Sequence, residues 1–316
     1  MTKVLFIAAW GRSGTTVLDN ILNSHESVFS VGELTYIWSR GLRQRRPCGC
    51  GAPFPECPLW QQILRVAYDD DPPSAAEVSA LQRRSLRIRH TPTILRTRNN
   101  PDVERYRGLI GRLYRAVADV TGATLIVDSS KSPADAALLS GVDGVEPYLL
   151  HVVRDPRAVA FSWSRPTSHH DASTPGLTHR HGPVDSSVSW LGWNLLIEGT
   201  ARTYPRRHRR LRYEDFLAEP RNTVEELLRF VGLPDSVGSA PASDPFAGPF
   251  ADQRTVSLRP NHTVSGNPSR FRTGEVSLRR DDRWLDQQDR RQRLISTLVS
   301  LPLLPRYRYP LWPGPR

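Results

Sequence analysis

The sequence Gly-Arg-Ser-Gly-Thr-Thr at residues 11–16 has the composition of an anion-binding turn. The apolar run at residues 3–10 predicts a buried strand before it, and the apolar spacing over 16–24 predicts a helix after it. A helix N-terminus offers unpaired N–H groups and the positive end of the helix dipole to phosphate or sulfate. Arg12 adds a forked cation, and Thr15 and Thr16 add hydroxyl donors. An ordinary glycine-containing turn between a strand and a helix is the alternative.

A second candidate anion site follows a later predicted strand at residues 148–153. Arg154 stands at the end of this strand, Asp155-Pro156 begins a helix, and Ser162 lies one to two turns into that helix. Arginine can contact phosphate with two parallel hydrogen bonds. A salt bridge between Arg154 and Asp155 is the alternative interpretation.

Lys131 is unusual in this chain, because 43 residues are Lys or Arg and the other lysine is Lys3. It follows a strand predicted over residues 124–127, so it belongs to the same kind of strand-end turn. A compact ammonium group can follow a departing oxygen where a planar guanidinium group fits less well. A chance placement of this lysine is the alternative.

Four segments, in order along the chain, resemble the sulfotransferases that use 3′-phosphoadenosine 5′-phosphosulfate (PAPS). They are residues 11–16 with the later Gly32-Glu33, the R-D-P-R stretch at 154–157, the Y-E-D stretch at 213–215, and residues 262–272. The first is most similar to the R-S-G-T-T branch, of bacterial type and related to protein-tyrosine sulfotransferases. The resemblance implies a P-loop-like three-layer α/β sandwich with a central, mostly parallel sheet flanked by helices. The alternation of predicted strands and helices agrees with this fold.

The resemblance also implies roles for individual residues. Contacts to the co-substrate PAPS, or to its product PAP, are expected from Arg12, Ser13, Gly14, Thr15, Thr16, Arg154, Ser162, Tyr213, Arg270 and Arg272. Among these, Arg154, Ser162 and Arg270 or Arg272 would contact the 3′-phosphate, and Tyr213 would lie near the nucleoside. Arg12 and Lys131 would neutralise charge on the sulfuryl group and on the departing phosphate. The reaction is expected to need no metal.

The general base is expected to be Glu33. Small-molecule sulfotransferases use a His two residues after the corresponding lysine, and this chain has Pro133 there. The protein-tyrosine branch uses a glutamate in a Gly-Glu segment, which matches Gly32-Glu33. Burial would make this weak base more useful by raising its pKa. The alternative is a solvated glutamate or a partner of Arg12.

We therefore expect sulfuryl transfer from PAPS to a hydroxyl of a natural product, phenol, sugar or glycolipid, in bacterial secondary metabolism. A kinase or NTPase of the P-loop class is a weaker interpretation, since Thr15 stands where the Walker lysine would fall. A nucleic-acid-binding protein is suggested only by the net charge of +11. We expect no nucleic-acid partner, because no DNA- or RNA-reading motif is present. The acceptor, the choice between O- and N-sulfation and the oligomeric state are not readable from the sequence.

The chain is expected to form one domain over residues 1–316, with irregular acceptor-side segments at about 36–100, 165–186 and 235–262. Apolar runs are too short for a membrane span, and no export signal is recognisable, so the cytoplasm is the expected location. Residues 48, 50 and 57 are cysteines whose fourth metal ligand is not evident, and a structural excursion is favoured over a zinc site. The loop with His169, His170, His179 and His181 is expected to lie on the acceptor side.

Overall fold

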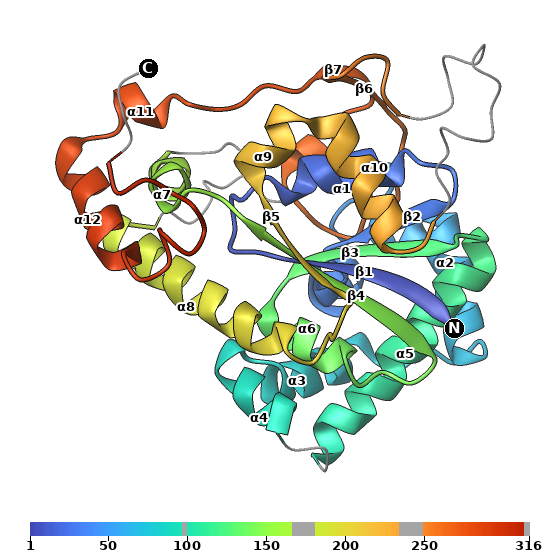
Figure 1. Cartoon of the computed structure of the whole chain (residues 1–316). Helices are drawn as coiled ribbons and strands as arrows, with labels where there is room; N and C mark the ends of the chain where they lie inside the picture. The colour runs from blue at the N-terminus through green and yellow to red at the C-terminus, as the bar shows by residue number, and fades with distance from the viewer. Residues whose placement is uncertain (97–99, 166–180, 234–248, 313–316) are drawn as a thin grey trace.

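The computed structural model describes residues 1–96, 100–165, 181–233 and 249–312. Its centre is a parallel five-stranded sheet with the order β2-β3-β1-β4-β5 (Figure 1). The strands are β1 (Thr2–Ala8), β2 (Val28–Gly32), β3 (Leu125–Lys131), β4 (Val145–Val153) and β5 (His208–Arg212). No helix in the described ranges is both long and apolar enough to span a membrane.

Helices cover both faces of the sheet, because alternate residues of β1 enter two different cores. Leu5 and Ile7 pack with the helices α1 (Thr15–Asn23), α9 (Tyr213–Ala218) and α10 (Pro220–Phe230). Val4 and Phe6 pack on the other face, against α5 (Pro101–Thr121) and α6 (Pro133–Leu139). Buried faces on both sides explain why these strands read as continuous apolar runs. The predicted three-layer α/β sandwich is confirmed.

Two strand predictions need correction. The strand β2 was not expected, since its five residues are flanked by Asn, Ser, His and Glu and have a weak apolar signal. The strand β3 continues to Lys131 instead of ending at residue 127. Its polar end stays in the sheet because Asp128 is buried with partners: it accepts hydrogen bonds from the Tyr114 hydroxyl at 2.5 Å and the Ser130 N–H at 2.8 Å.

The segment 36–100 was expected to be irregular and is largely helical. It contains the π-helical η2 (Ile37–Arg43), then α2 (Pro58–Tyr68), α3 (Ala75–Ser85) and α4 (Thr91–Arg96). These helices were not predicted because the sequence near residue 50 is rich in Pro, Gly and Cys. Their apolar faces extend the core around α5. The prediction holds only for the turns around residues 44–57.

The other two expected irregular segments are partly outside the described residues, at 166–180 and 234–248. In the described remainder, Pro183 begins the helix α8 (Pro183–Ala201), earlier than expected. The strands β6 (Thr255–Leu258) and β7 (Gly274–Ser277) form an antiparallel pair. The C-terminal part adds α11 (Trp284–Gln287) and α12 (Arg290–Ser300), and α12 packs on α8 and on α7 (Pro156–Ser164).

Candidate active site

The candidate residues gather at one edge of the sheet, because all five strands are parallel and each one ends at a predicted site residue. Glu33 follows β2, Lys131 ends β3, Arg154 follows β4, and Tyr213 follows β5. The turn at residues 11–16 follows β1, the central strand. Ligands of open α/β sheets bind outside the carboxyl ends of the strands, which is where these side chains lie.

The turn after β1 is shaped for a close approach of an anion to the backbone. Gly14 caps α1 with a φ of 80°, and no described side chain caps the first-turn N–H groups of this helix. A Cβ at Gly14 would lie 2.2 Å from Cε2 of Tyr213, so only glycine fits beneath this ring. The Ser13 hydroxyl donates to the Trp10 carbonyl at 2.7 Å and fixes the turn. The uncapped N–H groups therefore remain available to a ligand.

The two predicted anion sites lie side by side. Nη1 of Arg154 donates to the Arg12 carbonyl at 3.0 Å, and its guanidinium carbon lies 4.6 Å from the centre of the Tyr213 ring. In the described part of the chain Arg154 makes no ion pair with Asp155, which binds Arg157 instead at 2.7 Å. Burial lowers the pKa of Arg12, which reflects the cost of holding this cation away from water. The interpretation of Arg154 as a partner of Asp155 is therefore wrong.

The remaining predicted co-substrate contacts lie in different surroundings. Thr15 is buried and Thr16 half-buried in the first turn of α1, and Ser162 is half-buried on α7, without a hydrogen bond to Arg154 among the described residues. Arg270 is buried and donates to the carbonyls of Thr263 and Pro47, both at 2.6 Å. Arg272 is exposed and directly follows the short helix η5 (Pro268–Phe271). The guanidinium group of Arg270 thus holds the backbone in place, and its predicted contact with the 3′-phosphate stays a prediction.

Glu33 and Lys131 form an ion pair between neighbouring strand ends. Their side chains are 12% and 16% exposed, so the pair is largely shielded from water. Nη1 of Arg40 approaches the second carboxylate oxygen at 3.7 Å. The predicted alternative partner of Glu33 was Arg12, and the structure places Lys131 and Arg40 there. A carboxylate and an ammonium group in contact can exchange or direct a proton at this position.

Lys131 and Arg12 both adopt left-handed backbone conformations, with φ of 69° and 68°. Such conformations are uncommon outside glycine and cost about 1–3 kcal/mol. Lys131 is held there by its carbonyl, which accepts hydrogen bonds from the Ala9 N–H at 3.2 Å and the Trp193 indole at 3.1 Å. The strain therefore occurs at the two cations predicted to act on the transferred group.

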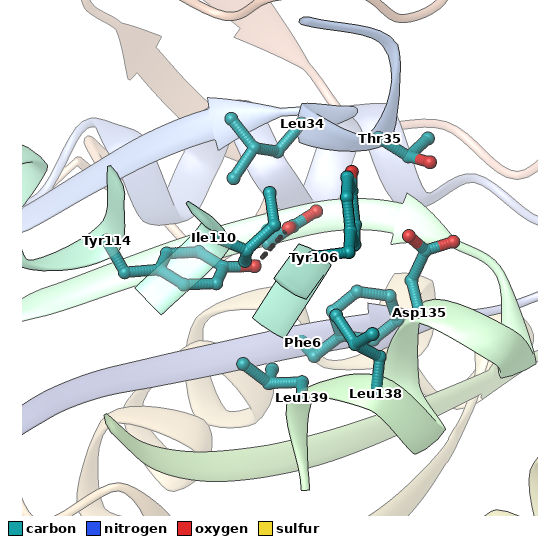
Figure 2. Close-up of a pocket in the computed structure, with 10 residues that line it drawn as sticks. Phe6, Leu34, Thr35, Tyr106, Ile110, Tyr114, Asp135, Leu138 and Leu139 are labelled. Carbon is teal, nitrogen blue, oxygen red and sulfur yellow. Dashed lines mark hydrogen bonds between the residues drawn. The ribbon is translucent and has the colours of Figure 1, made fainter. Parts of the chain in front are cut away.

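A layer of buried carboxyl groups lies beneath this edge, which sequence reasoning missed. Burial raises the pKa of Asp128 to about 6 and the pKa of Asp19 and Asp135 to about 7. Figure 2 shows Asp135 beside Tyr106 and Thr35, around a cavity of about 10 Å³. That volume has room for one water at most, so the cavity is part of the support under the site and not an acceptor pocket.

An aromatic cluster lies between Arg12 and Lys131. The ring of Trp10 lies 4.9 Å from that of Trp193 and 5.9 Å from that of Trp163. The guanidinium carbon of Arg12 lies 4.9 Å from the centre of the Trp163 ring, and the His181 ring meets this ring edge-to-face at 4.7 Å. Of the four loop histidines, His169, His170 and His179 lie outside the described residues. The gathering of these tryptophans around Arg12 and Lys131 depends on contacts between distant segments of the chain.

Residues 146–236, which include Arg154, Ser162 and Tyr213, match the sequence profile of the sulfotransferase family. No curated protein sequence matches. The sulfotransferase domain from the curacin biosynthetic pathway shares the fold with a TM-score of 0.53, 17% identity and coverage of 99% of both chains. The sulfotransferase domain of the Synechococcus PCC 7002 olefin synthase gives a TM-score of 0.46 and 19% identity, over 99% of this chain and 96% of that one. The chain is therefore similar to sulfotransferases in the sequence of residues 146–236 and in its fold.

Proposed function

We propose that the protein transfers the sulfuryl group of PAPS to an acceptor hydroxyl, with Glu33 as the general base. The observation that carries the proposal is the edge at which all five parallel strands end. There an uncapped helix N-terminus, Arg12, Arg154 and the Glu33–Lys131 pair converge. Anion donors and a proton acceptor are the two things that sulfuryl transfer requires.

The nucleotide would bind across the turn of residues 11–16. The first-turn N–H groups of α1, with Ser13, Thr15 and Thr16, suit the 5′-phosphosulfate. Arg154 suits the 3′-phosphate, because its guanidinium group reaches this turn and forms no ion pair within 4 Å with a described carboxylate; its Nη2 donates to the backbone carbonyl of Asp281 at 3.4 Å. Tyr213 fills the space between Gly14 and Arg154, where a nucleoside would meet it.

The chemistry is an in-line displacement at sulfur. The acceptor oxygen forms a bond to sulfur while Glu33 takes the hydroxyl proton, and the bond from sulfur to the 5′-phosphate oxygen breaks with both electrons on the departing PAP. Lys131 and Arg12 would stabilise the charge on the sulfuryl oxygens and on the leaving oxygen. Positioned charges of this kind supply most of the acceleration in such transfers.

The Glu33–Lys131 contact has a consequence for the order of events. While the ammonium group contacts Glu33, one of its three N–H donors and one oxygen of Glu33 are occupied. PAPS would draw Lys131 toward the sulfuryl group, which frees an oxygen of Glu33 for the acceptor. Arg40, at 3.7 Å, would then remain as the cation that orients this carboxylate.

The acceptor would lie against the aromatic cluster of Trp10, Trp163 and Trp193. Flat apolar walls next to Arg12 and Lys131 favour an acceptor with an apolar or ring-shaped body, as in a phenol, a sugar, a glycolipid or a natural product. A small-molecule or glycan alcohol of bacterial secondary metabolism, sulfated in the cytoplasm, is therefore the proposed substrate.

A mass-shift screen of such alcohols with PAPS, followed by kinetics of Glu33→Gln, tests the proposal. The variant should bind PAP within about threefold of wild type and lose at least about 100-fold in kcat, since positioned general bases contribute that much. Glu198→Gln is the matched control, because Glu198 is equally shielded and ion-paired but lies remote from the edge, with Arg210 at 3.2 Å and Arg306 at 2.9 Å. Near-normal turnover by Glu33→Gln would remove the base from this role, and absence of any sulfated product across the screen together with absence of PAP binding would refute the function.

A further inference from the structure

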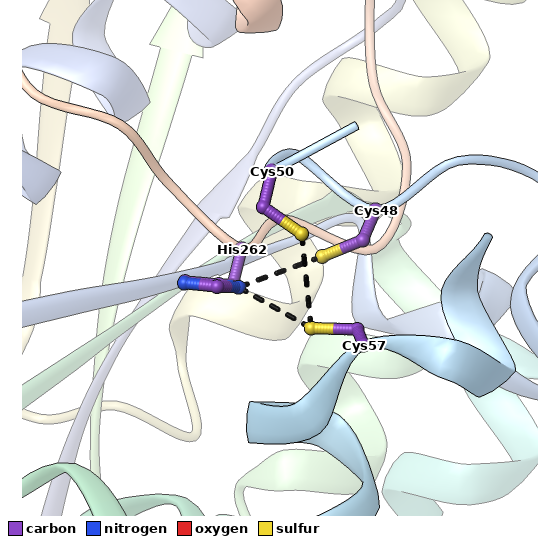
Figure 3. A group of neighbouring side chains, drawn as sticks. All are labelled: Cys48, Cys50, Cys57 and His262. Atoms are coloured by element: carbon purple, nitrogen blue, oxygen red, sulfur yellow. Dashed lines mark hydrogen bonds between the residues drawn. The ribbon is translucent and has the colours of Figure 1, made fainter. Parts of the chain in front are cut away.

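Four potential metal ligands from distant parts of the sequence meet at one point beside the active-site edge. Cys48, Cys50 and Cys57 lie in the turns between η2 and α2, and His262 comes from the segment after β6 (Figure 3). Their three sulfur atoms and one ring nitrogen all lie within 4.8 Å of one another. The fourth ligand that the sequence did not reveal is therefore His262, 205 residues after Cys57.

Three of the distances between ligand atoms lie close to those of a tetrahedral zinc site. Zinc bonds of about 2.3 Å to sulfur and about 2.0–2.1 Å to nitrogen require ligand-to-ligand edges of about 3.5–3.8 Å. Nδ1 of His262 lies 3.3 Å from Sγ of Cys57 and 3.8 Å from Sγ of Cys48, and Sγ of Cys50 lies 3.8 Å from Sγ of Cys57. A disulfide needs about 2.0 Å between sulfurs, so none joins these three described thiols.

Hydrogen bonds also hold the backbone around the cluster. The Trp60 indole donates to the His262 carbonyl at 2.6 Å, which fixes the backbone that carries the ring.

We propose that Cys48, Cys50, Cys57 and His262 bind one zinc ion in a closed structural site. Three thiols and one imidazole leave no position open for a substrate, as in structural rather than catalytic zinc sites. Thiolate and imidazole donors at tetrahedral spacing select Zn²⁺ over Mg²⁺ or Ca²⁺, which prefer oxygen. Binding would release the thiol protons that remain at neutral pH.

The ion would join two segments that already touch through their backbones. The Gly49 N–H donates to the Thr263 carbonyl at 3.0 Å, and a Cβ at Gly49 would lie 1.9 Å from Oδ1 of Asn261. Arg270, from the same late segment, donates to the Pro47 carbonyl. Zinc would therefore hold residues 47–57 and 261–270 together as one unit.

This unit reaches Glu33. Three residues after the histidine ligand, the Ser265 carbonyl accepts from the Glu33 N–H at 3.3 Å, and its hydroxyl accepts from Arg40 at 3.1 Å. The Val264 N–H bonds to the Val31 carbonyl of β2 at 2.9 Å. The metal would thus position the strand end that carries the proposed base without touching substrate.

Elemental analysis of the protein, expressed with zinc in the medium and purified without chelators, tests the assignment directly. We expect one zinc per chain, and replacement by Co²⁺ should give thiolate-to-cobalt charge-transfer bands and the intense visible bands of tetrahedral cobalt. His262→Ala should lose the metal and lower the Tm by about 5 °C or more, whereas His262→Cys should retain it. His90→Ala is the control for loss of a histidine, since His90 lies in the exposed helix η4 (Ile88–His90).

Metal content is independent of sulfuryl transfer, so its outcome leaves the proposed function untouched. Wild-type protein without zinc, with iron in its place, or with a disulfide among residues 48, 50 and 57 by mass spectrometry would overturn the assignment. If His262→Ala does not fold, the wild-type stoichiometry and the cobalt spectrum still decide the question.

Discussion

The molecule has two groups of residues suited to ions, and they are built in opposite ways. At the carboxyl edge of the sheet, the start of α1 supplies N–H groups, and Arg12, Lys131 and Arg154 supply cations from three strand ends; the backbone is strained at Arg12 and Lys131. At the Cys48–Cys50–Cys57–His262 cluster, four donors face one another and enclose a point. The first arrangement leaves N–H groups and cations that a ligand could bind. In the second, the ligand atoms of the protein face one another.

The difference predicts which property each variant will change. Residues at the open edge hold strain and uncapped donors that folding does not need, so their loss should affect ligand binding and turnover. Loss of a residue whose polar atoms are all bonded within the protein should instead lower the free energy of unfolding. The predictions below test this division.

The largest effect is expected for Lys131→Ala. Removing a charge that stabilises the departing phosphate should lower kcat about 1,000-fold, or roughly 4 kcal/mol, since single oxyanion donors have this magnitude. Steady-state kinetics with PAPS and an acceptor would measure it.

The other lysine of the chain is the matched control. Lys3 donates to the carbonyls of Val231 and Gly232 at 2.9 and 3.3 Å, far from the edge. Lys3→Ala should therefore change stability slightly and leave kcat within about twofold. Equal losses of kcat in the two variants would contradict the division.

Arg157→Gln should affect folding instead of catalysis. Arg157 is fully buried and bonded to both carboxylate oxygens of Asp155, at 2.8 and 2.7 Å. Its removal leaves a buried carboxylate unpaired, which costs about 3 kcal/mol or more. Chemical denaturation would measure this loss, and an unchanged unfolding midpoint would show that the pair contributes little.

Gly14→Ala should weaken PAP binding about 30-fold, or roughly 2 kcal/mol, because the new Cβ meets the Tyr213 ring and the φ of 80° strains any other residue. Gly192→Ala is the control: no described heavy atom outside its own helix turn lies within 4 Å of that Cβ. Calorimetric titration with PAP compares the two, and equal affinities would mean that the turn is not the binding surface.

The smallest effect concerns the pH dependence of stability. The pKa of Asp135 is raised to about 7 in the folded protein by burial and is near 4 when unfolded. Between these values the folded state holds the proton and the unfolded state does not, so stability falls as pH rises. Asp135→Asn removes this contribution and should reduce the fall between pH 6 and pH 7 by about 1 kcal/mol. Asp19 and Asp128 would retain theirs, and an unchanged slope in urea unfolding would contradict the raised pKa.

The open edge was largely predictable from sequence because its parts are contiguous. A strand, a glycine turn and a helix start lie within residues 3–24, and the R-D-P-R and Y-E-D stretches are equally local. Strand alternation then places these strand ends together without further information. The Glu33–Lys131 pairing was not predictable, since β2 is short and the order β2-β3-β1 depends on long-range packing.

The closed cluster was not predictable, for a physical reason. Three cysteines within ten residues suggest a metal, but the histidine that completes the set is 205 residues away and lies in a region that reads as a loop. The helices of residues 58–96 were also missed, because the turns before them dominate the local composition. Local sequence patterns predict helices, strands and motifs. Contacts between residues far apart in the sequence become known only from the folded structure.

The claim that two neighbouring anion sites hold opposite ends of one nucleotide is tested most directly by a pair of titrations. Affinities for PAP and for adenosine 5′-phosphate, which lacks the 3′-phosphate, would be measured by calorimetry in wild type and in Arg154→Gln. The account predicts that wild type prefers PAP by about 100-fold, as for a charge-assisted bidentate contact, and that the variant loses most of this preference with its affinity for adenosine 5′-phosphate unchanged. An equal preference in both proteins would contradict it.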